Sequence, residues 1–261
     1  MSGELITVTD YSAVRLLTMT GVCRGNALSA ELEALLLEAV RAAEGDEKIR
    51  AIVLCGTDRH FSVGADLNEV VRLNPSAAIV SGWLDGLDQL RRTSKPLIAA
   101  VRGNAIGGGF ELALCCDLIV AADDARFALP ETGIGVIAGQ GGSQRLLAMC
   151  GRAIATDLIL TGRTLSGQEA HDCGIVARVT RPECVLDEAI AVGQAIAGRS
   201  AIAVAFAREV LFEASEGPLR QSLRIERLLA ALVLDTPEAQ RRIGEFLTRR
   251  NTVKPATKET S

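Results

Sequence analysis

The chain has 261 residues, of which 48% are hydrophobic but only 3% aromatic. Aliphatic side chains and alanines must therefore form the core, as expected of layered helices and strands rather than a β-sandwich. A net charge of −4 and a pI near 5.4 argue against a nucleic-acid surface, which needs a concentrated basic stripe. No apolar run approaches the roughly 18 residues of a membrane span, and residues 1–10 lack the features of a signal peptide. We therefore expect a cytoplasmic protein.

The seven cysteines are an odd number, and no two of them form a C-x-x-C pair. Cys55, Cys115 and Cys116 fall in apolar runs. This pattern predicts small core residues rather than disulfides or structural zinc ligands.

The first elements in chain order are a hairpin and a helix. Residues 5–9 and 14–19 have β character and flank a turn-prone segment, which predicts the hairpin. Ser29 can cap a helix that runs to about residue 43, with Glu31 and Glu33 placed favourably in its first turn.

Strands and helices then alternate through the middle of the chain. The expected elements are a strand at 51–55, a helix at 75–92, a strand at 97–101, an apolar helix at 108–115 and a strand at 118–122. This alternation indicates an α/β protein with a parallel sheet built from crossover units.

After residue 182 the strand signals stop. Helical periodicity covers residues 183–198, 201–214, 218–233 and 237–249, which Pro182, Gly217-Pro218 and Pro237 separate. We expect an α/β core at 1–182, a helical region at 183–250 and a flexible polar tail at 251–261.

The first segment that can carry chemistry lies at residues 61–67, where a strand ends in small residues and a helix can begin at Asp66. Small residues let a ligand approach the backbone, and a helix start presents unpaired N–H groups. An ordinary strand-to-helix turn is the alternative.

The second segment, residues 104–111, places three glycines between a buried strand and an apolar helix. Glu111 follows Gly108 by three residues, so one helical turn brings its carboxylate to the side of the Gly108 N–H. A first-turn carboxylate can serve the helix dipole alone. In a helix that is buried throughout, however, desolvation suits it to proton transfer.

The third segment runs from Phe127 through Glu131 to the glycine-rich stretch that ends at Arg145. Its G-x-G-x-x-A pattern has the wrong context for dinucleotide binding, because no full hydrophobic strand precedes it. By itself, Glu131 could be a plain first-turn residue after Pro130.

Other chemistries find little support in the sequence. The chain has two histidines, His60 and His171, and no G-x-S-x-G motif, metal-ligand spacing or phosphate-binding loop. His60 and Ser62 could share one face of a strand, but a group to orient His60 is missing.

Taken together, six segments resemble the crotonase, or enoyl-CoA hydratase/isomerase, superfamily over nearly the whole chain. They are residues 24–29, 61–67, 107–113, 129–131, 141–146, and 161–163 with 169–170. The resemblance implies the crotonase superhelix of repeated ββα units, with C-terminal helices that form a homotrimer, often within a dimer of trimers.

The resemblance also implies the site. The backbone N–H groups of Ala65 and Gly108 would form an oxyanion hole for the thioester carbonyl, a type of donor worth a few kcal/mol each. Family members that hydrate a 2,3-double bond carry glutamates at the positions of Glu111 and Glu131. Glu111 would then activate water, and Glu131 would protonate the α-carbon. Many isomerases of the family keep only the second glutamate.

The expected reaction is the reversible syn addition of water to a trans-2-enoyl-CoA in fatty acid or related acyl-CoA degradation. No metal or redox cofactor is expected, and coenzyme A enters only with the substrate. The candidate residues for binding the acyl-CoA are Arg24, Ala27, Val63, Asp66, Leu67, Phe110 and Gly139.

Some positions depart from the family pattern. Family members often carry a basic residue at position 23, where this chain has Cys23. Arg24 is therefore expected to bind the CoA phosphates instead. Phe110 replaces smaller residues and would narrow the acyl pocket, unless it is a core phenylalanine. The alternatives are an isomerase, another enolate-forming lyase or hydrolase of the family, and a non-catalytic or RNA-binding member.

Overall fold

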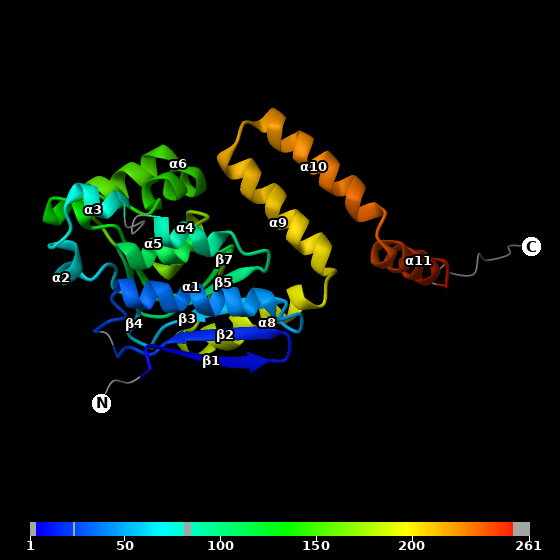
Figure 1. The fold of residues 1–261 in the computed structure, drawn as a ribbon, viewed down its shortest axis with the longest axis horizontal. Coiled ribbons are helices and arrows are strands. Elements are labelled where there is room, and N and C mark those ends of the chain that lie inside the picture. The colour runs from blue at the N-terminus through cyan, green and yellow to red at the C-terminus, as the bar shows by residue number, and fades with distance from the viewer. Residues whose placement is uncertain (1–3, 23, 81–84, 253–261) are drawn as a thin grey trace, which may run out of the picture. The chain divides into compact units, whose positions relative to one another are not determined.

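The computed structural model describes residues 4–22, 24–80 and 85–252 and divides into two units, 1–198 and 199–261 (Figure 1). The first unit is α/β and the second is helical. The first unit ends at Gly198 and not at the expected residue 182, because helix α8 (Val185–Ala197) packs against strands β2, β3, β5 and β7.

The larger sheet has the strand order β1-β2-β3-β5-β7-β10. Its strands are β1 (Ile6–Tyr11), β2 (Val14–Met19), β3 (Ala51–Cys55), β5 (Leu97–Val101), β7 (Leu118–Ala122) and β10 (Arg178–Thr180). Strands β1 and β2 form the predicted antiparallel hairpin, and every other pairing in this sheet is parallel.

The smaller sheet has the order β4-β6-β8-β9, formed by β4 (His60–Ser62), β6 (Asn104–Ile106), β8 (Arg126–Ala128) and β9 (Leu165–Ser166). Strands β4, β6 and β8 are parallel, and β9 runs antiparallel to β8. From β3 to β8, successive strands thus alternate between the two sheets, as expected of repeated ββα units.

Helices connect these strand pairs. They are α1 (Ala30–Gly45), α2 (Leu67–Val70), α3 (Pro75–Val80), α4 (Gly86–Arg91), α5 (Gly108–Cys115), α6 (Gly142–Thr161) and α7 (Gly167–Asp172), with short 3-10 helices η2 (Glu131–Ile134) and η3 (Pro182–Cys184). Ser29 caps α1 as predicted, since its side chain accepts a hydrogen bond from the Leu32 N–H.

The helix expected at residues 75–92 differs in the structure. Helix α3 ends at Val80 and α4 begins at Gly86, while residues 81–84 of the expected helix lie outside the described residues. Asp85 is the N-cap of α4, so a new helix starts there.

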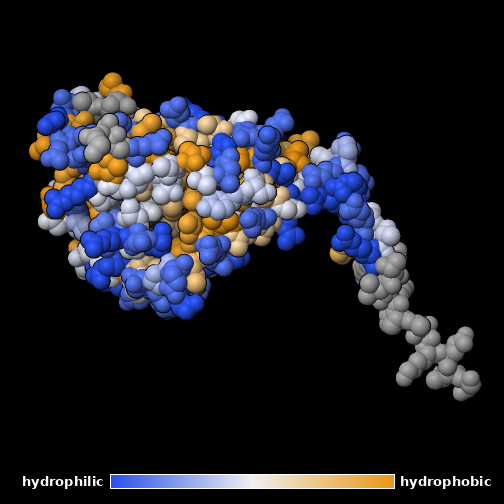
Figure 2. Space-filling view, turned by 90° about the horizontal axis from the view of Figure 1, so that it is seen from below, coloured by the Kyte–Doolittle hydropathy of each residue, from blue (hydrophilic) through white to orange (hydrophobic). Residues whose placement is uncertain are grey.

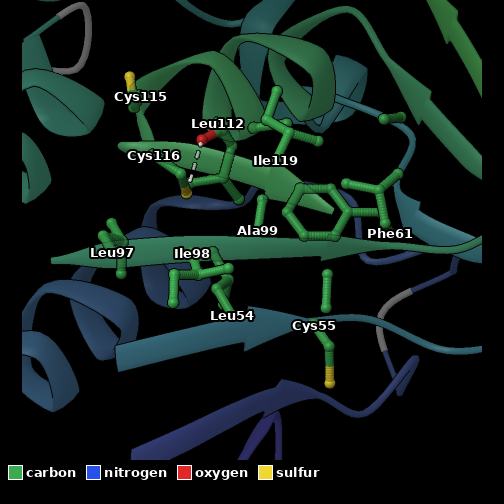
Figure 3. Close-up of a cluster of buried hydrophobic side chains, with 14 of the residues drawn as sticks. Leu54, Cys55, Phe61, Leu97, Ile98, Ala99, Leu112, Cys115, Cys116 and Ile119 are labelled. Carbon is green, nitrogen blue, oxygen red and sulfur yellow. Dashed lines mark hydrogen bonds between the residues drawn. The ribbon is translucent and has the colours of Figure 1, made fainter. Parts of the chain in front are cut away.

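The core lies between the larger sheet and the helices and is almost entirely aliphatic. Cys55, Cys115 and Cys116 are buried in it, as predicted. Figure 3 shows part of this core, where Ile98 and Ala99 point to opposite faces of β5. Tight packing on both faces of the larger sheet makes it a rigid support for the smaller sheet, whose strand ends carry the candidate site.

The second unit contains α9 (Ala201–Glu216), α10 (Leu219–Leu234) and α11 (Pro237–Thr252), and α9 packs against α10. In its described residues no hydrophobic side chain is fully buried. Among the described helices, none is by itself both long and apolar enough to cross a membrane; only the bent pair Pro182–Ala197 and Ala201–Glu216 meets that test jointly.

Candidate active site

Three site segments follow three neighbouring strands of the smaller sheet. Residues 63–66 follow β4, residues 107–108 follow β6, and residues 129–131 follow β8. Because the carboxyl ends of parallel strands meet at one edge of a sheet, segments far apart in the sequence come together there. All three had been predicted to carry chemistry.

Ala65 is held by a short bridge to Leu28. The Leu28 N–H donates to the Gly64 carbonyl at 2.8 Å, and the Asp66 N–H donates to the Leu28 carbonyl at 3.1 Å. In a parallel bridge, successive residues direct their backbone groups to opposite sides. The N–H of Ala65 therefore points away from Leu28.

Gly108 is the first residue of α5, so its N–H has no acceptor within the helix. Gly107 precedes it with φ 56° and ψ −128°, a conformation open mainly to glycine. An ideal Cβ on Gly108 would lie 3.4 Å from the nitrogen of Ala65. The two N–H groups therefore lie side by side, and neither donates a hydrogen bond to another group in the described part of the chain.

One detail of the predicted arrangement differs. Helix α2 is only four residues long, so it adds little dipole to the Ala65 side of the pair. The Ala65 N–H is positioned by the bridge to Leu28, and only α5 contributes a longer helix terminus.

Glu111 is 3% exposed in the first turn of α5, which confirms the predicted burial. Its Oε1 accepts two backbone hydrogen bonds, from Gln140 and from Gly142, each at 2.8 Å. These two donors fix the orientation of the carboxylate and leave Oε2 as the oxygen that can accept a hydrogen bond from a water molecule.

Glu131 begins the 3-10 helix η2 directly after Pro130 and is half-buried. Its Oε2 is buried and accepts no hydrogen bond from any described residue. Burial raises the pKa of Glu131, and the negative charge of Glu111 raises this pKa further. A carboxyl group in this setting is suited to donate a proton.

Gly107 connects the two glutamates. Its carbonyl accepts a hydrogen bond from the Glu111 N–H at 3.0 Å, and an ideal Cβ on it would lie 2.8 Å from Oε1 of Glu131. The Glu131 carboxylate and the N–H groups of Ala65 and Gly108 therefore lie around residues 107 and 108, and the Glu111 carboxylate is close enough to raise the pKa of Glu131. Two acid–base groups beside an oxyanion site can move protons on either side of a carbonyl-activated carbon.

The other predicted binding residues differ in how much of their surface is exposed. Arg24, Val63, Leu67 and Gly139 are exposed, whereas Ala27 and Asp66 are half-buried. Oδ1 of Asp66 caps α2 by accepting from the Asn68 N–H at 2.8 Å. Cys23, the position that usually carries a basic residue, lies outside the described residues.

Phe110 is completely buried, and its ring lies 5.1 Å from that of Phe127 at a tilt of 52°. A side chain without exposed surface does not line a pocket. The structure therefore favours a core phenylalanine, the alternative stated above, over a residue that narrows the acyl site.

His60 and Ser62 do not form a catalytic pair. Ser62 Oγ donates to the Asn26 carbonyl at 2.7 Å, while Nδ1 of His60 pairs with the Asn104 amide at 3.1 Å. His171 is exposed, and its ring contacts the Val176 carbonyl.

The sequence did not single out the groups that hold Glu111. Gln140 and Gly142 lie in the glycine-rich stretch where helix α6 begins. This helix start could have indicated a carboxylate partner, since N–H groups at a helix start bind anions. Glu33, which contacts the Gln140 side chain, had been assigned only to the dipole of α1.

Comparison with known proteins agrees with this geometry. The family model described as enoyl-CoA hydratase/isomerase matches residues 9–254. The chain belongs to the enoyl-CoA hydratase/isomerase family. Similar proteins include a probable enoyl-CoA hydratase of Rhizobium meliloti (strain 1021), 39% identical over 96% of this chain and 97% of the relative. Another is a 2,3-dehydroadipyl-CoA hydratase of Escherichia coli (strain K12), 36% identical over 95% and 96%.

Among solved structures, an enoyl-CoA hydratase from Bacillus anthracis is similar, with a TM-score of 0.88 and 30% identity over 94% of this chain and 97% of that one. The family, the fold class and the prediction of a hydro-lyase of the enoyl-CoA hydratase type are therefore confirmed.

Proposed function

We propose that this member of the family adds water reversibly to the 2,3-double bond of a trans-2-enoyl-CoA. The observation that carries the proposal is that the paired N–H groups of Ala65 and Gly108 lie beside the Glu131 carboxylate, whose pKa the charge of Glu111 raises. The N–H pair would hold the thioester oxygen and stabilise the enolate that forms when a nucleophile adds to C3.

Each glutamate takes one proton step in this proposal. Glu111 accepts a proton from water through Oε2 while the oxygen of that water bonds to C3. Glu131 delivers a proton to C2, and the negative charge on the thioester oxygen returns to the carbonyl. Glu131 then regains a proton and Glu111 loses one before the next turnover. The pKa of Glu131, which burial raises, favours its protonated form at the start of this cycle.

Apolar side chains at the site support an acyl substrate. Val63, Leu67 and Val71 near α2 are exposed, as are Ile134 and Ile137 after Glu131. Hydrophobic residues also reach the surface of the first unit among charged ones, at the left of Figure 2. Acyl groups that bury such side chains would be bound through the hydrophobic effect.

We propose further that no metal or redox cofactor takes part, that coenzyme A enters with the substrate, and that the enzyme acts in the cytoplasm. A place in fatty acid β-oxidation fits the family. We also propose a homotrimer or a dimer of trimers, in which the exposed apolar side chains of α9 to α11 are covered by other subunits.

The test supplies the wild-type enzyme with trans-2-enoyl-CoA and 3-enoyl-CoA thioesters of several chain lengths in deuterated water. We expect loss of the 2,3-double bond with deuterium at C2, and slower conversion of the 3-enoyl substrates. An enzyme that moved the 3-enoyl bond efficiently but ignored every 2-enoyl substrate would be an isomerase.

A further inference from the structure

Gln140 is held at three of its polar groups. Its N–H donates to Oε1 of Glu111 at 2.8 Å, its carbonyl accepts from Nη1 of Arg145 at 2.6 Å, and its side-chain Nε2 donates to Oε1 of Glu33 at 3.2 Å. The residue is 8% exposed. A main-chain group that touches the water-activating glutamate is thus fixed by two charged side chains.

Glu33 reaches Gln140 from the first turn of α1. Its Oε2 lies against Gly86 of α4, where an ideal Cβ would be 2.8 Å away. The glycine leaves room for the carboxylate between α1, α4 and Gln140. Glu31 also lies in this first turn and is exposed, so the helix dipole does not require that Glu33 be half-buried.

Keeping Glu33 in this place has an electrostatic cost. The pKa of Glu33 is raised to about 7, mainly by burial. The hydrogen bond from Gln140 lowers this pKa, whereas the charges of Glu69 and Glu111 raise it further. A destabilised carboxylate at a contact between three elements is typical of a functional role rather than of a solvated helix face.

The segment around Gln140 needs an anchor. Gly139 and Gly141 flank the residue, and Gly141 has φ 90°. Glycine leaves the backbone many conformations, so the N–H that touches Glu111 would sample several directions without side-chain contacts. Arg145 provides one anchor and is itself held by Asp88 of α4 at 2.8 Å.

We propose that Glu33 is a positioning residue for Glu111: by binding the Gln140 side chain, it keeps the Gln140 N–H on Oε1 and so aims Oε2 at the water. The proposal rests on the proposed hydratase function. Small displacements of a reacting group have large effects on rate, because the reacting atoms must meet in a narrow range of geometry.

The first experiment compares hydration by Glu33→Ala, Gln140→Ala and Glu33→Gln with that of the wild type. We expect kcat to fall roughly 10-fold in the two alanine variants with little change in KM. Glu33→Gln keeps an oxygen for Gln140 and should retain most of the wild-type kcat. Glu31→Ala, a change in the same turn of α1 without contact to Gln140, is the control and should leave kcat unchanged.

A second measurement separates positioning of Glu111 from general damage. Exchange of the C2 proton of a saturated acyl-CoA in deuterated water needs Glu131 and the oxyanion hole but no activated water. The alanine variants should keep this exchange while they lose hydration. The double variant Glu33→Ala/Gln140→Ala should be no worse than the more impaired single variant, because both remove one interaction.

Hydration of a 2-enoyl-CoA by the wild type is measured first. If the wild type did not hydrate it, the proposed hydratase function would be wrong, whereas the role of Glu33 is judged only from the variants of an active enzyme. Given an active wild type, an alanine variant with unchanged kcat overturns the role of Glu33. Equal losses of hydration and exchange would do the same, since they would indicate a general disturbance. If Glu33→Ala does not fold, Gln140→Ala decides the question alone through the same two rates.

Discussion

Gly107 lies against the carboxylate of Glu131, and a methyl group on its Cα would stand 2.8 Å from Oε1. We therefore expect Gly107→Ala to displace Glu131 and to lower kcat for hydration by about 10²-fold. Gly135→Ala is the control: its φ of 81° is also positive, but its added Cβ would have no neighbour within 4 Å. Equal losses of activity in the two variants would mean that backbone strain, and not the contact with Glu131, is responsible.

The paired glutamates lead to a second prediction. Glu111→Gln and Glu131→Gln should each reduce hydration roughly 10² to 10⁴-fold, the usual contribution of a general acid or base. Substrate binding should weaken only modestly, because the proposed oxyanion hole consists of backbone N–H groups that neither substitution removes. Steady-state rates with a 2-enoyl-CoA and deuterium incorporation at C2 measure the two effects separately. Full hydration by Glu111→Gln would contradict the assignment of the base.

A third prediction concerns stability and pH. The pKa of Glu33 is raised to about 7, so the folded chain binds more protons at this site than the unfolded chain between about pH 4.5 and 7. Its contribution to stability is therefore present at low pH and lost as the pH rises through 7. Glu33→Gln removes this loss, so the Tm of the variant relative to wild type should rise from pH 5 to pH 8. Thermal melts across this range, with Glu31→Gln as the control, should show the trend only for Glu33; a flat difference would contradict the raised pKa.

The burial of Phe110 predicts an effect on stability rather than on specificity. Phe110→Ala should lower the free energy of unfolding by about 3 to 5 kcal/mol, because it leaves a cavity beside Phe127. Denaturant unfolding measures this loss, and a panel of acyl-CoA substrates measures preference. A stable variant with a shift toward bulkier acyl groups would restore Phe110 to the pocket wall.

The exposed leucines of α10 predict that assembly depends on this helix. Leu228 and Leu232 are one helical turn apart and are 58% and 59% exposed. Light scattering should give a trimer or hexamer for the wild type and a smaller species for Leu228→Lys/Leu232→Lys. Glu226→Lys, a charge change at an exposed polar position of α10, is the control. A monomeric wild type at micromolar concentration would overturn the proposed assembly.

Local patterns predicted most of the fold. The cap at Ser29, the alternation of strands and helices, and the turns at Gly64 and Gly107 depend on residues close in the chain, which is what a sequence displays. The start of a new helix at Gly86 was missed because helical periodicity continues across residues 75–92. The space that Gly86 leaves for the Glu33 carboxylate depends on tertiary packing, which periodicity does not show.

The site could be predicted only in part for a physical reason. Glu111 and Glu131 stand in recognisable strand-to-helix segments. The contact from Gln140 to Glu33 joins residues 107 positions apart, and the one from Gln140 to Glu111 joins residues 29 apart. Periodicity and spacing do not show which distant loops meet, because tertiary packing of α1, α4 and α5 decides it.

The proposed oxyanion donors are backbone groups, which affects how this enzyme can change. Substitutions at Ala65 and Gly108, other than proline, leave the backbone N–H groups in place. Stabilisation of an enolate therefore depends on the backbone conformation at these two residues. Proton transfer to or from that enolate depends instead on the side chains at positions 111 and 131, which substitutions can change. We therefore expect substitutions at those two positions to change how the enolate is protonated while the backbone donors that stabilise it are retained.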